Sequence, residues 1–352
     1  MSRIAQLSFS SVTLLCITLL SGVGVENLVG RTPQTSAAGS RRPHASAYDL
    51  FGVSGTSSTD VFAVGDAGTI LHWDGTNWYP QQCGTFQRLL AVWMGSPGDG
   101  YAVGAGGTIV RYNGSSWTVV PTRAGTAYDL RAVWGSSPHD VFAVGDAGTI
   151  LHYDGDGWTS QVSNSVANLL AVWGLSPANV YAVGAANELL HYDGTSWQTV
   201  ALNSVFPPGY AGLQYTFKAV WGGASSKDLY LVGGATISSN YTTGNDVGVV
   251  TQDTYVGLAV VLHFDGSSWS ADAQQLPCRI QAIWGDSAAD AHAIGDDGSI
   301  LHFDGARWSP QGALTKANLL GPTTTLVYGI WATPDGHIFV VGPQGAIYNM
   351  TF

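Results

Sequence analysis

Apolar residues occur along most of the chain in short blocks that are separated by glycines and polar turn residues. One block shows the order clearly, with apolar or β-branched runs at 130–134, 141–145 and 149–153, then Asp154-Gly155 and Trp158. Runs of this length, rich in Val, Ile and aromatic residues, are typical of β-strands. The block therefore predicts three short strands and a tight turn, with the tryptophan opening a fourth strand.

The same block recurs along the chain. Seven units begin near residues 49, 88, 129, 168, 216, 279 and 326, and the compact units are about 39 to 41 residues long. A period of this size with four strands per unit indicates a β-propeller in which each unit is one blade. We therefore predict an all-β fold over residues 45–352, a seven-bladed β-propeller of four-stranded antiparallel blades.

Each part of the repeat predicts a place in a blade. The first strand carries a small residue that suits the crowded axis of the ring, at Gly52, Ala91, Ala132, Ala171, Ala219, Ala282 and Gly329. The second strand is an unbroken apolar run and should be covered on both faces by adjacent blades. The Asp-Gly pair suits a hairpin between the third and fourth strands, and the tryptophan should fill the gap between blades.

The seventh unit stops at Phe352, directly after its third strand. Residues 45–48 precede the first unit, and we predict that they supply the missing fourth strand. The ring would then be closed by the N- and C-terminal strands, which removes the open sheet edges that invite unwanted pairing.

The first residues have the features of an export signal. Arg3 precedes an apolar run at residues 12–20, and small residues follow at Gly22 and Gly24. This predicts a signal peptide over 1–24 and a flexible lead-in over 25–44. The run is short for a bilayer span, so we expect no integral membrane span in the mature chain and a secreted, periplasmic or cell-surface location. An uncleaved anchor, or a lipoprotein through Cys16, stays an alternative.

The composition argues against some classes of ligand and metal site. The formal net charge of −11 argues against nucleic acid, which needs a basic surface. After signal removal only Cys83 and Cys278 remain, too few for a disulfide scaffold or a zinc site. We expect them to be unpaired small apolar residues, with a disulfide as the alternative. We expect no cofactor and a monomeric protein.

The unit at residues 144–158 (Val-Gly-Asp-Ala-Gly-Thr-Ile-Leu-His-Tyr-Asp-Gly-Asp-Gly-Trp) resembles the Asp-box, or bacterial neuraminidase, repeat. It is still more similar to the repeat of photosystem II stability and assembly factor propellers and their bacterial relatives. The resemblance spans residues 49–352. It implies the propeller fold, but proteins of this fold include sialidases, other glycosidases and non-enzymatic binders, so it assigns no activity.

Two sets of repeated polar residues are interpreted as structural. Histidines recur at one position of the third strand, as His72, His152, His191, His263 and His302. Equivalent positions on different blades are too far apart for one metal, so we expect no metal site and instead a hydrogen bond within each blade, to the hairpin aspartate. Those hairpin aspartates, such as Asp154, are expected to be turn residues rather than calcium ligands.

Binding residues are expected where units break the repeat. The starts of the first strands should surround the mouth of the central channel, and they carry charged and polar residues at Asp49, Arg88, Asp129, Arg131, Asn168, Lys218, Arg279, Gln281 and Tyr328. Long connections at 201–216, 235–257 and 311–325 should emerge on the same face. They contribute Tyr210, Tyr215, Tyr241, Asp246 and Tyr255 as further candidates.

These features favour a non-catalytic binding propeller, secreted or on the cell surface, that recognises a glycan or a protein through this face. A glycoside hydrolase or polysaccharide lyase is the first alternative. Such an enzyme needs paired carboxylates. Asp49 and Asp129, two blades apart, are the acids we can place at the mouth, and the long loop could add Asp246 and Asp253. An assembly factor that docks partner proteins is the second alternative, from the family resemblance.

Overall fold

The computed structural model describes residues 48–121, 125–202, 204–206, 213–223, 228–243, 250–271, 276, 278–287, 290–313, 327–333 and 335–351. The chain divides into two units, residues 1–35 and 36–352, and the second contains all the described residues. The predicted signal peptide and lead-in lie outside them. No helix in the described part of the chain is long and apolar enough to cross a bilayer.

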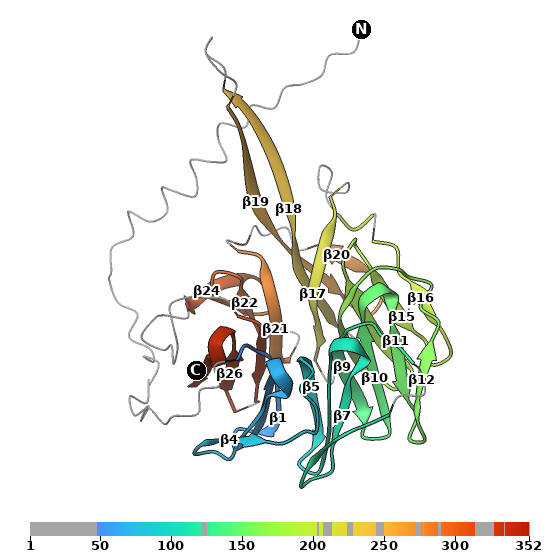
Figure 1. The fold of residues 1–352 in the computed structure, drawn as a ribbon. Coiled ribbons are helices and arrows are strands. Elements are labelled where there is room, and N and C mark those ends of the chain that lie inside the picture. The colour runs from blue at the N-terminus through green and yellow to red at the C-terminus, as the bar shows by residue number, and fades with distance from the viewer. Residues whose placement is uncertain are drawn as a thin grey trace. The chain divides into compact units, whose positions relative to one another are not determined.

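The described strands form antiparallel sheets that follow one another in chain order around a ring (Figure 1). Six sheets have four strands and one has three, and within each sheet the strands are ordered as they occur in the sequence. The predicted seven-bladed β-propeller is therefore confirmed. We number the blades 1 to 7 along the chain and call their successive strands a, b, c and d.

The strand bounds follow the repeat. Blade 1 has β1 (Leu50–Ser57), β2 (Asp60–Gly65), β3 (Ile70–Trp73) and β4 (Trp78–Gln81). Blade 2 has β5 (Leu89–Ser96), β6 (Asp99–Gly104), β7 (Ile109–Tyr112) and β8 (Trp117–Val119). Blade 3 has β9 (Leu130–Ser137), β10 (Asp140–Gly145), β11 (Ile150–Tyr153) and β12 (Trp158–Gln161). Blade 4 has β13 (Leu169–Ser176), β14 (Asn179–Gly184), β15 (Leu189–Tyr192) and β16 (Trp197–Thr199).

The last three blades are less uniform. Blade 5 has β17 (Tyr215–Gly222), β18 (Leu229–Thr243), β19 (Val250–Phe264) and β20 (Trp269–Ala271). Blade 6 has β21 (Ile280–Ser287), β22 (Asp290–Gly295), β23 (Ser299–Phe303) and β24 (Trp308–Ala313). Blade 7 has β25 (Gly329–Ala332), β26 (His337–Val341) and β27 (Ile347–Thr351).

The core lies between adjacent blades. One apolar cluster joins Phe62 of blade 1 to Leu89 and Trp117 of blade 2, all nearly or fully buried. Strand b is buried along its whole apolar run, as in β2 and β10, because each of its faces meets a different blade. Trp158, which opens strand d of blade 3, is 1% exposed and meets Tyr101 of blade 2 edge-on at 5.6 Å. The expected place of the repeated tryptophan between blades is confirmed for this unit.

The glycine after the strand-a tryptophan allows the blades to approach each other. A Cβ added at Gly174 of blade 4 would lie 2.5 Å from the ring of Trp134 in blade 3. That distance is too short for any side chain, so the edge of the tryptophan ring of one blade contacts the backbone of the next. The ring is thus held by a repeated tryptophan-on-glycine contact near the axis.

The ring closes where blade 7 meets blade 1. The Leu50 N–H donates to the Gly342 carbonyl at 3.0 Å, and Phe51 stacks on Tyr328 with ring centroids 5.2 Å apart. Of residues 45–48, which were predicted to add a fourth strand to blade 7, only Tyr48 is described, and it lies in a bend. The rest of that prediction falls outside the described residues.

The hairpin aspartates act as turn residues, as expected. In blade 3, Asp154 Oδ1 accepts the backbone N–H groups of Asp156 and Gly157 at 3.0 and 3.2 Å. These bonds hold the pKa of Asp154 below its usual value, because they stabilise the charged carboxylate. Gly155 has a φ of +99°, a conformation that glycine adopts without strain.

The excursion at 235–257 is a continuation of two strands rather than an irregular loop. Strands β18 and β19 pair without a break from Leu229 with Phe264 out to Thr243 with Val250, and Figure 1 shows them running on well beyond the rest of their blade. The extension starts from the end of strand b, beside the start of strand a, since Thr216 pairs with Gly234. It therefore leaves the blade on the face where the strands a begin.

Both cysteines are free and buried, so the disulfide alternative is wrong. The Cys83 thiol donates to the Gly68 carbonyl at 3.1 Å. Burial, together with the nearby Asp297, raises the pKa of Cys278 to about 12. Both residues act as small buried side chains, as expected.

Candidate binding site at the channel mouth

The strands a begin together at one mouth of the central channel. Seven equivalent positions there hold Phe51, Leu90, Arg131, Leu170, Lys218, Gln281 and Tyr328. The set is uneven around the ring. Blades 7, 1 and 2 present aromatic or aliphatic side chains, whereas blades 3, 5 and 6 present two cations and an amide, with Leu170 of blade 4 between the two cations. The mouth therefore has an apolar side and a side that is richer in cations.

Three arginines at the mouth are held by the aspartates of the b–c turns. Arg131 donates to both carboxylate oxygens of Asp146 in its own blade, from Nε and from Nη2, with Nη2–Oδ2 at 2.9 Å. Arg279 Nε donates to Asp296 at 2.8 Å. Arg88 reaches instead into the preceding blade, where its Nε lies 2.5 Å from Asp66. Its guanidinium also lies 5.1 Å from the centre of the Phe51 ring. These contacts fix the guanidinium groups in place and neutralise much of their charge.

Lys218 differs from these arginines. It is exposed, and among the described residues no carboxylate lies within ion-pair distance of it. Partial burial lowers the pKa of Lys218, and the positive charges of Arg279 and Arg131 lower it further. An amine crowded by two guanidinium groups and lacking an acidic partner would gain most from an added anion.

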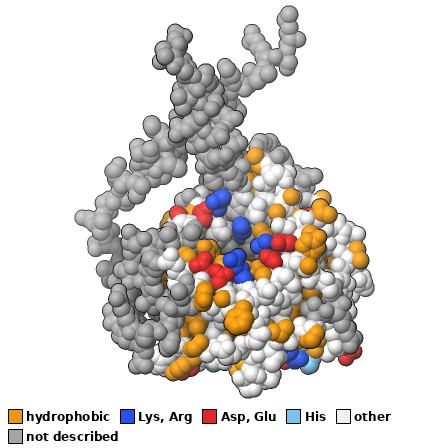
Figure 2. All heavy atoms as spheres, viewed as in Figure 1, with side chains coloured by type: hydrophobic (Ala, Val, Ile, Leu, Met, Phe, Trp, Pro, Cys, Tyr) orange, Lys and Arg blue, Asp and Glu red, His pale blue; other side chains and the backbone are white. Residues whose placement is uncertain are grey.

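A cavity of about 420 Å³ opens beside Lys218. It is lined by Gln214, Thr216, Lys218, Gly234, Arg279, Ile280 and Gln281. Figure 2 shows this face, with Lys, Arg, Asp and Glu side chains gathered around a hollow in its centre. The cavity combines cations, amides and a hydroxyl, and it lies between the first strands of blades 5 and 6.

The remaining acids of the mouth connect one blade to the next. Asp129 Oδ1 accepts the Gly106 N–H from the preceding blade at 2.9 Å, and Asp49 Oδ1 accepts the Gln344 N–H at 2.8 Å. Asn168 does the same for Ala147 at 3.1 Å. In these three cases the accepting residue comes immediately before strand a, and the donor is the central residue of the b–c turn in the preceding blade. Asp49 and Asp129 are thus engaged in holding the ring together.

The structure brings some predicted site residues together and separates others. Lys218, Arg279 and Gln281 line the cavity, and Tyr328 is 41% exposed at the opposite, apolar side. Tyr215 is only 2% exposed and stacks on Phe206 at 4.4 Å, so it belongs to the core. Tyr241 pairs with Gln252 and Tyr255 with Ser238 in the extended hairpin. Tyr210 and Asp246 lie outside the described residues.

Sequence reasoning missed the aspartates that hold the mouth arginines. Asp66, Asp146 and Asp296 occupy one repeat position, in the b–c turn, and all three form ion pairs. The sequence carries one signal for these pairs, an arginine near the start of a strand a. For Asp146 and Asp296 the arginine belongs to the same blade (Arg131 and Arg279), and for Asp66 it belongs to the next blade (Arg88).

The strand-c histidines form hydrogen bonds within their blades, as predicted, but the predicted partner, the hairpin aspartate, is wrong. The Nε2 atoms of His72 and His152 lie 2.7 and 2.6 Å from Asp60 and Asp140, the residues that begin strand b. The hairpin aspartate next along the chain bonds to its own turn instead. The direct partner of His152 on strand b is Phe142. Asp140 lies two residues before Phe142 and therefore on the same face of the sheet, which brings it beside His152.

Fold and mouth together define a seven-bladed β-propeller with a charged, cavity-bearing channel mouth. Among solved structures the chain is similar to YCF48 bound to D1 peptide, with 15% identity over 87% of this chain and 94% of that chain and a TM-score of 0.61. It is also similar to YCF48 from Cyanidioschyzon merolae, with 15% identity, coverage of 87% and 96%, and a TM-score of 0.59. No family model and no curated protein matches the chain. At this identity the similarity shows the shared fold.

Proposed function

We propose that this chain is a non-catalytic propeller that binds a segment of another protein at its channel mouth. The observation that carries the proposal is Lys218, an exposed cation without an acidic partner among the described residues, beside a cavity of about 420 Å³. An acidic side chain or a terminal carboxylate would supply the missing anion and form a charge-assisted hydrogen bond. The apolar side of the mouth, at Phe51 and Tyr328, would accept hydrophobic side chains of the same segment.

Two further points support a protein ligand. YCF48, which has the same fold, is seen with a bound peptide. The mouth also combines fixed guanidinium groups with an exposed aromatic ring, and Arg and Tyr are among the residues enriched at the centre of protein interfaces.

Catalysis has less support at this mouth. A glycosidase needs two carboxyl groups free to donate and accept protons. Asp49 and Asp129 each accept a backbone N–H from a neighbouring blade, and Asp66, Asp146 and Asp296 are bonded to arginines. Carboxylates used in this way hold neighbouring blades and the mouth arginines in place.

A glycan is the second candidate ligand. Gln214, Thr216 and Gln281 line the cavity with neutral hydrogen-bonding groups, and Tyr328 offers an exposed ring. We also propose that the protein is exported, on the basis of the N-terminal sequence. The mass of the mature protein, recovered from its source, tests this, because cleavage of the signal would leave a chain that begins near residue 25.

A binding screen with the purified chain tests the proposed function. Arrays of acidic and neutral peptides with free or amidated C-termini, together with a glycan array, are probed with the wild type. We expect acidic or carboxylate-ended peptides to bind the wild type and Lys218→Ala to weaken this binding at least tenfold at low salt. Added salt should weaken binding to the wild type and reduce the difference between the two proteins, because it screens the charge of Lys218. Arg307→Ala removes the same charge from an exposed hairpin distant from the cavity and should change nothing.

The contrary outcomes are distinct. Equal losses in Lys218→Ala and Arg307→Ala would mean that only the overall charge matters and would remove the mouth from consideration. Binding confined to glycans would replace the protein ligand with the second candidate. Turnover of a polysaccharide by the purified protein would restore the enzyme alternative.

A further inference from the structure

Blade 6 departs from the repeat at one position of strand b. The third residue of this strand is aromatic in the other six blades, at Phe62, Tyr101, Phe142, Tyr181, Tyr230 and Phe339, and each is at most 6% exposed. In blade 6 the same position holds His292. A core position that is otherwise always a large ring here carries two nitrogen atoms that can bind protons or metals.

The aromatic residue normally stacks on the strand-c histidine. Phe142 and His152 lie 4.1 Å apart, ring to ring, and are nearly parallel. His292 keeps this place, with its ring 4.7 Å from that of His302. It is the direct partner of His302 in the β22–β23 ladder, so the two side chains stand side by side on one face of the sheet.

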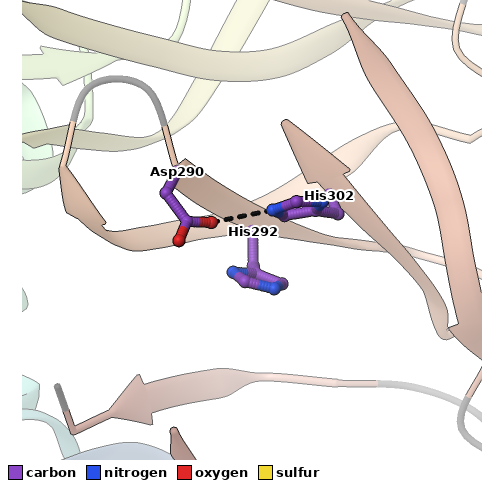
Figure 3. A group of neighbouring side chains, drawn as sticks. All are labelled: Asp290, His292 and His302. Carbon is purple, nitrogen blue, oxygen red and sulfur yellow. Dashed lines mark hydrogen bonds and ion pairs between the residues drawn. The ribbon is translucent and has the colours of Figure 1, made fainter. Parts of the chain in front are cut away.

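Asp290 completes the group. It lies two residues before His292, hence on the same face, and its Oδ1 is 2.7 Å from His302 Nε2. One ligand atom from each of Asp290, His292 and His302 can be chosen so that all lie within 4.8 Å of one another. Figure 3 shows the aspartate and His302 joined by a hydrogen bond, with the ring of His292 beside them.

The group is also more open than its counterpart in blade 3. The Asp290 side chain is 54% exposed, whereas that of Asp140 is 21% exposed. In blade 3 the aromatic ring is covered by Tyr192 and Trp197 of the following blade. In blade 7 the position of Tyr192 is Met350, and the described part of that blade has no fourth strand to carry a counterpart of Trp197.

We propose that Asp290, His292 and His302 form a binding site for Zn²⁺. Two imidazoles and a carboxylate are a common donor set for this ion, and three protein ligands leave a fourth position for water. Metal entry would replace the Asp290–His302 hydrogen bond. Both groups would become ligands, and their separation would widen to about 3.3 Å, as tetrahedral coordination requires.

The site is separate from the channel mouth. Asp290 begins strand b, at the a–b hairpin end of the blade, whereas the mouth lies where strand a begins. The zinc site and the proposed protein-binding site can therefore be tested independently, and failure of one does not affect the other.

Zinc titration of the full chain tests the site. The purified protein is treated with EDTA, dialysed and titrated with ZnCl₂ by isothermal calorimetry, and its thermal midpoint is followed in parallel. We expect one equivalent to bind, with a rise in Tm of about 4 °C at a free zinc concentration one hundred times the Kd. His292→Phe should abolish both effects, because it restores the aromatic residue of the other blades.

Two further variants separate loss of the site from loss of the fold. Asp290→Asn keeps a hydrogen bond like that between Asn179 and His191 in blade 4 and should weaken zinc at least tenfold. His72→Asn changes the equivalent histidine of blade 1, where Phe62 stands in place of a third ligand, and should leave zinc binding unchanged. The proposal fails if the wild type binds no zinc, if His292→Phe still binds it, or if His72→Asn loses it equally.

Discussion

Blades 3 and 6 have the same strand order and the same aspartate–histidine pair, but the pair has different surroundings in the two blades. In blade 3 the pair Asp140–His152 is covered by Phe142 and by two aromatic rings of blade 4. In blade 6 the pair Asp290–His302 has His292 beside it and is more exposed. The comparison shows that the solvent exposure of this polar pair depends on the aromatic side chains of the following blade. Where that neighbour has less aromatic cover, a structural pair can become a site.

The largest effect should come from giving blade 3 the histidine of blade 6. Phe142 is fully buried, so Phe142→His removes apolar burial and places a polar ring where it meets Tyr192 and Trp197. We expect a loss of about 3 kcal/mol in the free energy of unfolding. His292→Phe in blade 6 should change it by less than about 1 kcal/mol. Urea unfolding measures both, and similar values for the two would mean that the blades do not differ in cover.

Removal of the histidine from each pair should give a smaller difference. In His152→Ala the carboxylate of Asp140 keeps the hydrogen bond from the Ser136 hydroxyl and is largely shielded from water. We expect a cost of about 2 kcal/mol. His302→Ala should cost about 1 kcal/mol, since the more exposed Asp290 can be hydrated. Equal costs in urea unfolding would contradict the difference in exposure.

The contacts at the start of strand a offer a third comparison. Asp129 of blade 3 ties its blade to the preceding one through Gly106, whereas Arg279 of blade 6 bonds within its own blade to Asp296. Asp129→Ala should therefore cost about 1 kcal/mol and Arg279→Ala about 0.5 kcal/mol or less. The same unfolding measurement applies, with Arg307→Ala as the control for loss of a surface charge. A larger cost for Arg279→Ala than for Asp129→Ala would contradict the view that the contact between blades contributes more to stability than the ion pair within a blade.

Acid should affect the hairpins of both blades alike. Backbone N–H groups hold the pKa of Asp154 and of Asp304 below the ordinary value of 3.8. Because the pKa is lower in the folded state, the stabilisation is complete above the unfolded pKa and is lost as the pH falls through the folded one. We expect the urea midpoint to fall below about pH 4.

Asparagine provides the control for this acid effect, because Asn113 already forms the same turn in blade 2. Asp154→Asn and Asp304→Asn should each reduce the acid sensitivity by a similar small amount. An unchanged pH profile in both variants would show that these turns do not contribute to it.

Part of the candidate site could be predicted from the chain alone. The place of Lys218, Arg279 and Gln281 at one mouth followed from counting positions in the repeat. The pairing of Arg131 with Asp146 did not, because the two residues lie on different elements of the blade and the repeat pattern does not contain the distance between them. Tyr215 was chosen as a loop aromatic, but it is buried because strand a of blade 5 begins at that residue and its ring stacks on Phe206.

The sequence by itself determined whatever is repeated: the strands, the Asp-Gly turns, the tryptophans between blades and the number of blades. Each of these depends on residues a few positions apart, and their recurrence made the pattern clear. Only the tertiary structure decided which groups meet across strands or blades. Examples are Asp140 with His152, Asp129 with Gly106, and His292 with Asp290 and His302. Such contacts depend on strand register and on the cover provided by the next blade, which a linear pattern does not contain.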